Sequence, residues 1–313
     1  SKSVDSTFIR TRGQSWFEDE IDWDITKLLT LKTLNPLLEN KIIPVVTGYF
    51  GMTEAGDYSS MGRGSSDFTG AILTVCLGRK QLEIWTDVDG FMTADPRIVK
   101  KAEVLKELNY QEVTELCFFG AKVLHPKTIR PVVDNTGEVW IKNTFNGSAH
   151  GTRILKKSMA YDREILSIAS KKTAVVSLDL FDTQVTAHRT RVMADLFCLF
   201  DEYGYSIDVV TSREGEITIC FDRKYLDNTD FRLGLESLAP VAYKNDSSVL
   251  SLVFSEMAKD NAGVINRITR VLAEQEISLN VISQTASEVC LLLVVLDCDV
   301  TSAIGEIHKE LVE

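Results

Sequence analysis

A loop rich in glycine and serine over residues 62–67 has the side chains needed to bind a small molecule that carries both an anion and an amine. It reads Gly-Arg-Gly-Ser-Ser-Asp, and its two glycines let backbone N–H groups approach an anion at the start of the helix expected after it. Arg63 can form paired hydrogen bonds with a carboxylate or phosphate, and Asp67 can accept hydrogen bonds from an amine. A flexible loop before a capped helix explains the same residues equally well, because Ser66 and Asp67 are frequent N-cap types.

A second cluster of polar residues follows a predicted strand. It reads Trp-Thr-Asp-Val-Asp-Gly over residues 85–90 and continues with Asp-Pro-Arg over residues 95–97. In open α/β sheets, ligands bind beyond the carboxyl ends of the strands, where this cluster must lie. Its acids and Arg97 could hold the ribose and phosphates of a nucleotide with Mg²⁺ bridging, but a pair of aspartate-rich turns explains them equally well.

A third segment, Phe-Gly-Ala-Lys-Val-Leu-His-Pro over residues 119–126, places a lysine on the loop after a predicted helix. Lys122 can reach a phosphate as a point charge. His125 precedes a proline and is interpreted as a structural hydrogen-bonding residue rather than a base. The histidines and cysteines do not have the spacing of metal ligands, so we expect no metal site built by the protein.

The second half of the chain contains an internal repeat. A shift of about 72 residues places residues 206–211 on residues 278–283, and the apolar positions of a helix before them also coincide. Each copy reads as strand, helix, strand, strand and a closing helix-strand region, and Ile165–Ser170 could complete the second copy. Asp208 and Asn280 occupy equivalent positions, where they could bind an amino group or stabilise a turn.

The elements that position these segments alternate between strand and helix in the first half, which predicts a mostly parallel α/β sheet. A hairpin is expected to turn at residues 54–57. Expected helices are Ile25–Glu39, Ser66–Leu77 and Tyr110–Phe119; expected strands are Lys41–Phe50, Gln81–Trp85, the latter buried, and Val139–Asn143.

Composition excludes several classes of protein. The 313 residues carry a net charge of −11, which argues against a broad surface for nucleic acid or anionic membrane. The longest apolar run, Val289–Leu296, is far shorter than the roughly 20 residues that span a bilayer. The six cysteines are scattered among apolar neighbours, so we predict buried, reduced thiols and a cytoplasmic location.

Together, the three segments resemble the signatures of the aspartokinases, and the repeated half resembles their tandem ACT domains. The resemblance implies an α/β fold: part of an amino-acid kinase domain with a mostly parallel sheet, followed by two α+β ACT units of βαββαβ topology. We expect kinase residues over 1–155 and a regulatory region over 156–313. Within it, the first ACT unit would cover about 173–247, and the second about 163–171 together with 248–313.

The resemblance also implies a reaction, in which the γ-phosphoryl group of ATP, bound with Mg²⁺, passes to the β-carboxylate of L-aspartate and gives 4-phospho-L-aspartate. Arg63 and Asp67 would be the catalytic residues and would hold the α-carboxylate and the amino group of the substrate. The substrate-binding set would be Arg63, Gly64, Ser65, Ser66 and Asp67, and the nucleotide-binding set Thr86, Asp87, Met92, Arg97 and Lys122.

For regulation, the resemblance implies a feedback amino acid bound by the ACT units, with lysine the first expectation and threonine the second. The binding residues would be Val192, Met193, Ser206, Ile207, Asp208 and Asn280. ACT units of this kind associate, so at least a homodimer is expected. A non-catalytic regulatory chain, or an amino-acid-binding module, is the alternative.

Several positions depart from the family pattern. Ser65 replaces a glycine and Met92 a tyrosine, while Arg191 and Arg213 replace a glycine and a serine in the first ACT unit. The family's opening strand and Lys-Phe-Gly-Gly-Thr-Ser loop, whose lysine neutralises the transferred phosphoryl group, has no counterpart in the sequence. We therefore expect that the N-terminal part of the kinase domain is missing and that this chain alone is inactive.

Overall fold

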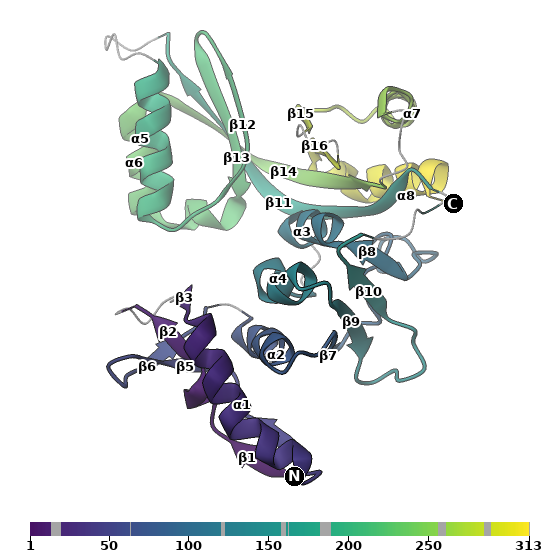
Figure 1. Ribbon diagram of the computed structural model, residues 1–313. Coiled ribbons are helices and arrows are strands. Elements are labelled where there is room, and N and C mark those ends of the chain that lie inside the picture. Colours follow the sequence, from purple (N-terminus) through teal and green to yellow (C-terminus); the bar gives the residue numbers. More distant parts are fainter. Residues whose placement is uncertain are drawn as a thin grey trace. The chain divides into compact units, whose positions relative to one another are not determined.

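The computed structural model describes residues 1–13, 20–62, 64–119, 123–157, 161, 163–181, 189–255, 261–284 and 289–312 (Figure 1). The chain divides into two compact units. Unit 1 comprises Ser1–Thr93 and Ala102–Tyr161, and unit 2 comprises Ala94–Lys101 and Asp162–Glu313. Each unit has its own sheets and core.

Unit 1 contains three small sheets with both parallel and antiparallel ladders. One sheet consists of the parallel pair β1-β4. The other two have the strand orders β3-β2-β5-β6 and β7-β9-β10-β8. In the last, β7 and β9 run parallel to each other, as do β8 and β10. The strands are β1 (Lys2–Val4), β2 (Arg10–Arg12), β3 (Glu20–Ile21), β4 (Pro44–Val46), β5 (Phe50–Thr53), β6 (Tyr58–Ser60), β7 (Gln81–Thr86), β8 (Glu107–Asn109), β9 (Glu138–Asn143) and β10 (Thr152–Leu155).

The three helices expected over residues 25–39, 66–77 and 110–119 form in unit 1, within two residues of the expected bounds, whereas the helices Ser6–Phe8 and Pro126–Asp134 were not predicted. Asp22 caps the first helix by accepting a hydrogen bond from the backbone N–H of Ile25, which satisfies one of the free donors of a helix start. The third helix has the predicted bounds. The helices are η1 (Ser6–Phe8), α1 (Trp23–Glu39), α2 (Ser65–Cys76), α3 (Tyr110–Phe119) and α4 (Pro126–Asp134).

Two strand predictions were wrong in part. The expected single strand over residues 41–50 is interrupted after Val46, because Gly48 and Tyr49 have φ angles of +67° and +76° and reverse the chain before β5. Strand β7 forms as predicted but is not buried, since only Ile84 reaches the core and 51% of Trp85 is exposed. The predicted hairpin turn between β5 and β6 is confirmed.

Unit 2 is built on one six-stranded sheet with the order β12-β13-β11-β14-β16-β15. Figure 1 shows that β11 and β14 run through the whole sheet, with α5 and α6 near one end and α7 and α8 near the other. The elements are β11 (Ile165–Asp179), α5 (Arg189–Glu202), β12 (Ile207–Arg213), β13 (Glu216–Asp222), η2 (Arg223–Asp227), α6 (Thr229–Leu238), β14 (Val241–Phe254), α7 (Asn261–Glu274), β15 (Val281–Gln284), β16 (Cys290–Leu296), η3 (Asp297–Asp299) and α8 (Val300–Leu311).

The two long strands each serve both copies of the repeat. Residues 173–179 of β11 pair with β13, while residues 165–171 pair with the part of β14 that also pairs with β16. Thr173 and Ser247 lie opposite each other where the strands pass from one copy to the other. The two copies therefore share a continuous sheet.

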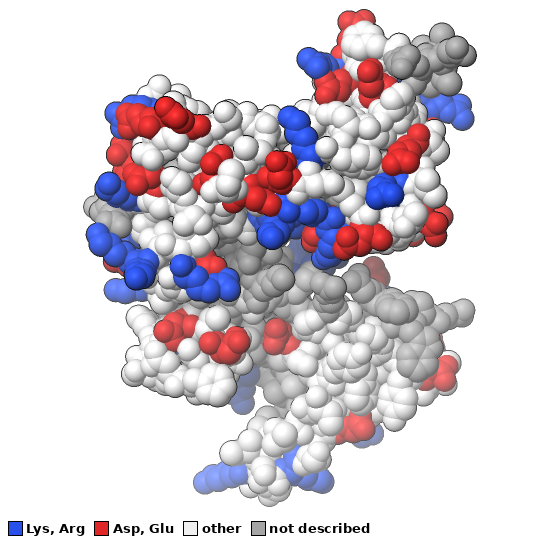
Figure 2. Space-filling view, turned by 180° about the vertical axis from the view of Figure 1, so that it is seen from behind, with Lys and Arg blue, Asp and Glu red and all other residues white. Residues whose placement is uncertain are grey.

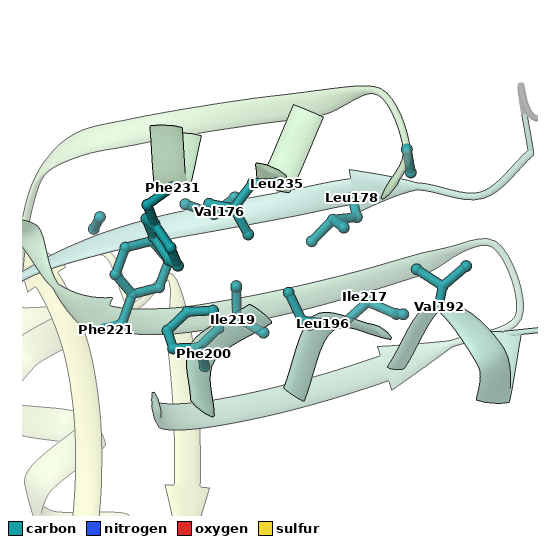
Figure 3. Close-up of a cluster of buried hydrophobic side chains, with 12 residues drawn as sticks. Val176, Leu178, Val192, Leu196, Phe200, Ile217, Ile219, Phe221, Phe231 and Leu235 are labelled. Carbon is teal, nitrogen blue, oxygen red and sulfur yellow. The ribbon is translucent and has the colours of Figure 1, made fainter. Parts of the chain in front are cut away.

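The core of the first copy lies between this sheet and two helices (Figure 3). Alternate residues of the strands point toward the helices, as period-two patterning requires. Rings of Phe200, Phe221 and Phe231 meet edge to face, with centroids 5.0–5.9 Å apart. The labelled core residues are Val176, Leu178, Val192, Leu196, Phe200, Ile217, Ile219, Phe221, Phe231 and Leu235.

An ion pair joins the two copies where the long strands cross over. Arg223 follows β13 and Asp297 follows β16, and the guanidinium donates to both carboxylate oxygens at 2.8 and 2.9 Å. The same guanidinium reaches the carbonyl oxygens of Thr173 and Ser247. The guanidinium holds the pKa of Asp297 below its usual range, mainly through its hydrogen bonds to the carboxylate.

The surface carries charges of both signs. On the face drawn in Figure 2, Lys and Arg side chains are interspersed with Asp and Glu. Within the described ranges, no helix is long and apolar enough to cross a membrane. The prediction of buried cysteines was wrong for Cys198 and Cys298, which are exposed on α5 and η3.

Replacing Arg223 with leucine should lower the free energy of unfolding by about 1–2 kcal/mol, because the variant loses charge-assisted hydrogen bonds in a partly buried site. Since the folded pKa of Asp297 is lowered, its contribution is present above its ordinary pKa and is lost as the pH falls through the folded pKa. Urea unfolding at pH 7 and at pH 3 measures both effects, and the loss caused by R223L should shrink at pH 3.

The control is Arg232→Leu, which removes an exposed pair with Glu236 at 4.0 Å. Such surface pairs contribute about 0–0.5 kcal/mol. Equal losses from R223L and R232L would show that the pair between the copies has no special role.

Candidate functional site

The glycine-rich loop and the segment around His125 come together in unit 1. Gly64 is the N-cap of α2 and has a φ of +69°, a conformation that favours glycine. A Cβ at this position would lie 3.1 Å from Cγ2 of Thr128 and 3.4 Å from Cβ of His125. The first and third segments singled out in the sequence are therefore neighbours at the starts of α2 and α4.

The start of α2 offers backbone donors to a ligand. Gly64 has no side chain, so no side-chain cap binds the first N–H groups of the helix. Ser65 is buried, and its carbonyl oxygen accepts a hydrogen bond of 2.8 Å from the hydroxyl of Thr69. These N–H groups and the positive end of the helix favour an anion at this place.

Asp67 adds a half-buried carboxylate in the first turn of α2. Burial raises its pKa, and no opposing hydrogen bond or ion pair from another described residue compensates. A carboxylate in such a place gains from a ligand that brings a positive charge or N–H donors. Arg63, its predicted partner in the site, lies outside the described residues.

The turn after β4 is a part of the site that sequence reasoning missed. A Cβ on Gly48 would lie 3.6 Å from both Cα of Ser66 and Oγ1 of Thr69, so this turn packs against the first turns of α2. Thr47 is anchored there, because its hydroxyl accepts a hydrogen bond of 3.2 Å from the backbone N–H of Ser6. The signal was a Thr-Gly pair directly after a strand, which marks a turn.

Connectivity places the second segment at the same end of unit 1. Helix α2 is about 18 Å long and strand β7 about 20 Å. Only residues 77–80 join them, and a Cβ on Gly70 would lie 3.1 Å from Cδ1 of Leu82, so the chain turns back after α2 and the helix packs against the strand. The start of α2 therefore lies at the end of the layer where β7 ends, near Thr86 and Asp87. The hydroxyl of Thr86 donates to Asp87 at 3.1 Å.

The turn after β7 is fastened to the segment that follows β9. Asn143 and Asn146 donate side-chain hydrogen bonds of 2.6 and 3.1 Å to Asp89. Gly90 has a φ of +139°, and a Cβ there would lie 2.4 Å from the hydroxyl oxygen of Thr152, so only glycine fits. Asp89 thus organises the turn and leaves Asp87 exposed.

The remaining predicted nucleotide residues are only partly described. Met92 is half-buried and forms a backbone bridge with Val104. Arg97 is exposed, pairs with Asp95 at 2.6 Å and belongs to the segment Ala94–Lys101 of unit 2. Lys122 lies outside the described residues. The structure therefore brings Thr86 and Asp87 together but gives no common geometry for the full set.

Unit 2 contains the predicted effector residues. Asp208 lies at the start of β12, its side chain is fully buried, and Lys171 pairs with it at 2.9 Å. Ser206 is exposed and its hydroxyl lies 3.3 Å from that of Tyr225. Val192 packs in the core of the first copy with Met193 half-buried beside it, Ile207 is half-buried, and Asn280 is exposed.

Metal-binding clusters are not found in the described ranges, since no three His, Cys, Asp or Glu residues there are placed to hold an ion.

Comparison with family models finds two matches. Residues 8–143 match the amino acid kinase family, and residues 250–311 match an ACT domain. The second match covers the second copy of the repeat.

Comparison with curated proteins finds aspartokinases. The chain is 32% identical to the aspartokinase of Schizosaccharomyces pombe over 100% of its own length and 64% of that protein. It is 30% identical to aspartokinase 1, chloroplastic, of Arabidopsis thaliana over 88% of its own length and 49% of that protein. The chain thus spans about half to two thirds of the length of these relatives.

Solved structures of the same kind share the fold. Escherichia coli aspartokinase III in complex with aspartate and ADP (R-state) matches 100% of this chain and 70% of its own, with a TM-score of 0.79 and 25% identity. The same enzyme in complex with lysine and aspartate (T-state) matches 99% of this chain and 69% of its own, with a TM-score of 0.84 and 25% identity.

Asp67→Asn should make the chain more stable at neutral pH, because it removes a charge that burial disfavours. The raised pKa means that the folded state of the original chain binds more protons than the unfolded state and loses stability as the pH rises through it. We expect the melting temperature of D67N to exceed that of the original by about 2 °C at pH 7, and less at pH 4.

The control for this substitution is Asp57→Asn, on the exposed turn between β5 and β6. Thermal unfolding of the three proteins at both pH values provides the comparison. A melting temperature of D67N at or below that of D57N at pH 7 would mean that the carboxylate of Asp67 is already compensated.

Proposed function

Because the chain belongs to the aspartokinase family, we propose that it forms part of a site where the γ-phosphoryl group of ATP passes to the β-carboxylate of L-aspartate and gives 4-phospho-L-aspartate. The observation that carries this proposal is the half-buried carboxylate of Asp67, which no other described residue compensates, at the start of α2, where no side chain caps the helix. The carboxylate of Asp67 and the backbone N–H groups at the start of α2 together match a small ligand with one ammonium and at least one carboxylate group.

In this proposal, the α-carboxylate of aspartate is held by Arg63 and by the backbone N–H groups of Gly64, Ser65 and Ser66. Asp67 accepts hydrogen bonds from the amino group, which leaves the β-carboxylate as the free nucleophile. Support comes from the missing side-chain cap of α2 and from the half-buried position of Asp67. Arg63 and Asp67 act by positioning the substrate, which supplies much of the catalysis in phosphoryl transfer.

The nucleotide would bind at the carboxyl end of β7. Thr86, Asp87, Met92, Arg97 and Lys122 form the proposed set, and Mg²⁺ arrives with ATP as part of the substrate. The packing of α2 back against β7 supports this arrangement, because it would bring the two proposed substrates to one end of unit 1. Arg97 belongs to unit 2, so its place in this set remains a prediction from the sequence.

Residues 156–313 would regulate the kinase residues 1–155 by binding an amino acid. The T-state neighbour is a complex with lysine, so lysine is the first effector to test and threonine the second. The proposed binding residues are Val192, Met193, Ser206, Ile207, Asp208 and Asn280. The proposal includes association of the ACT units into at least a homodimer, and a cytoplasmic location, which free cysteines favour.

L-Aspartate should raise the melting temperature of the 313-residue chain, because a ligand that binds only the folded state stabilises it by mass action. Succinate, which has both carboxylates but no amino group, should have a much smaller effect. D67N should reduce the response to L-aspartate to that of succinate, while D57N should keep the full response. Differential scanning fluorimetry with each ligand at equal ionic strength measures this.

An equal response to L-aspartate and succinate in the original chain would contradict amine recognition by Asp67. No response to either ligand would favour the alternative, a regulatory chain that binds amino acids only in unit 2.

Phosphoryl transfer by the 313-residue chain alone is expected to be absent. The residues that match the family lack the lysine-bearing loop that neutralises the transferred group, and such charge neutralisation supplies much of the rate. A hydroxylamine assay for the acyl phosphate, with ATP, Mg²⁺ and L-aspartate, checks this. Turnover that D67N abolishes and D57N preserves would show that another cation replaces the lysine.

A further inference from the structure

The buried carboxylate of the first ACT copy already has a cationic partner from its own chain. The ammonium group of Lys171 lies 2.9 and 3.0 Å from the two carboxylate oxygens of Asp208. Lys171 belongs to β11, at the point where this strand passes from one copy to the other, and Asp208 lies in a bulge of β12 between Ile207 and Val209. Three strands of one sheet thus bring together two residues that are 37 positions apart.

Because Asp208 is buried, its carboxylate needs a cationic or hydrogen-bonding partner. The side chain of Asp208 has no exposed surface, whereas 21% of that of Lys171 is exposed. Burial raises the pKa of Asp208, and the charge of Lys171 and its hydrogen bonds act in the opposite direction. A carboxylate removed from water needs a cation or donors, and the lysine side chain provides a primary ammonium group. This is the same chemical group that a free amino acid would bring.

A second acid and a second lysine complete the surroundings. Asp222, at the end of β13, lies opposite Thr173 of β11, two positions from Lys171, so its charge also acts on this pair. Asp222 has its own partner in Lys224 at 2.9 Å. The ammonium of Lys171 is therefore the cation that neutralises Asp208.

We propose that Lys171 is an internal ligand of the amine-binding carboxylate in the first ACT copy, so that a free amino acid reaches Asp208 only by displacing it. This inference rests on the proposed regulation of the chain by an amino acid. It adds a determinant that the sequence pattern of the effector residues does not contain, because Lys171 lies outside that pattern.

The second copy of the repeat shows the contrast. Its equivalent residue, Asn280, is neutral and exposed, so it has no charge to be satisfied. The first copy therefore combines the chemistry of an amine site with an occupant, and its affinity for a free amine is lowered by the free energy of releasing Lys171.

The test removes the occupant and supplies a free amine. Lys171→Met keeps a long apolar side chain but leaves Asp208 without its ammonium. The probe is n-butylammonium chloride, a primary amine without a carboxylate, and tetramethylammonium chloride, which has no N–H donor, controls for ionic strength. We expect butylammonium to raise the melting temperature of K171M by about 2–4 °C in a saturable way and to leave the original chain unchanged relative to tetramethylammonium.

Two further variants make the result specific. The double variant K171M/D208N should lose the response, and Lys172→Met, which changes the exposed neighbouring lysine, should behave like the original chain. An equal response of the original chain and K171M would overturn the proposal, as would a response that survives in K171M/D208N.

A second measurement keeps the test decisive if K171M does not fold. It compares the affinity for L-lysine of the original chain, D208N and Lys171→Gln. Binding of L-lysine to the original chain that is lost in D208N, with an affinity unchanged in Lys171→Gln, would show that Lys171 does not compete. Because butylammonium is not a substrate and the readout is not turnover, failure here is distinct from failure of the aspartate-binding test, which decides the proposed kinase function.

Discussion

The ladder between β11 and β14 is the interaction on which unit 2 depends. Each strand supplies one half to the first copy of the repeat and the other half to the second, and the exchange occurs where Thr173 lies opposite Ser247. The two copies are therefore joined through the backbones of both central strands. The ion pair of Arg223 and Asp297 closes this junction, because the two residues hold equivalent places after β13 and β16 and carry opposite charges. Two identical copies would place like charges there, so the pair favours this tandem over self-pairing of one copy.

A different constraint shapes unit 1, where the chain reverses between α2 and β7. The reversal brings an open helix start and the end of a strand to one end of the layer, and Gly64 allows the start of α4 to pack closely against the loop. Asp67 is held there without a partner among the described residues. A buried charge without compensation costs stability, and such costs are typical of binding sites that need a ligand to complete them.

Local patterns predicted much of this molecule, and pairings over long distances limited the rest. The helix over residues 110–119 and the hairpin turn at 54–57 follow from periodicity and turn chemistry, which are properties of neighbouring residues. The strand over residues 41–50 was predicted too long, because apolar residues alone do not show a left-handed turn at Gly48 and Tyr49. Lys171 gave no signal as a partner of Asp208, since only the assembled sheet brings them together. Arg63 and Lys122 remain predictions because they lie outside the described residues.

Asp67 and Asp208 show how one physical cost can have two outcomes in one chain. Burial raises the pKa of each carboxylate, so each would gain from an ammonium group. The fold supplies that group to Asp208 through Lys171, which pairs with Val249 of β14 and lies two residues before the ladder of β11 with β13 begins. No described residue does so for Asp67, which lies at the start of a helix beside two loops. A ligand amine can stabilise the site of Asp67 outright. At Asp208 it must compete with Lys171, which is part of the same sheet and cannot diffuse away. Amine recognition should therefore be strong in unit 1 and weak in the first copy of the repeat.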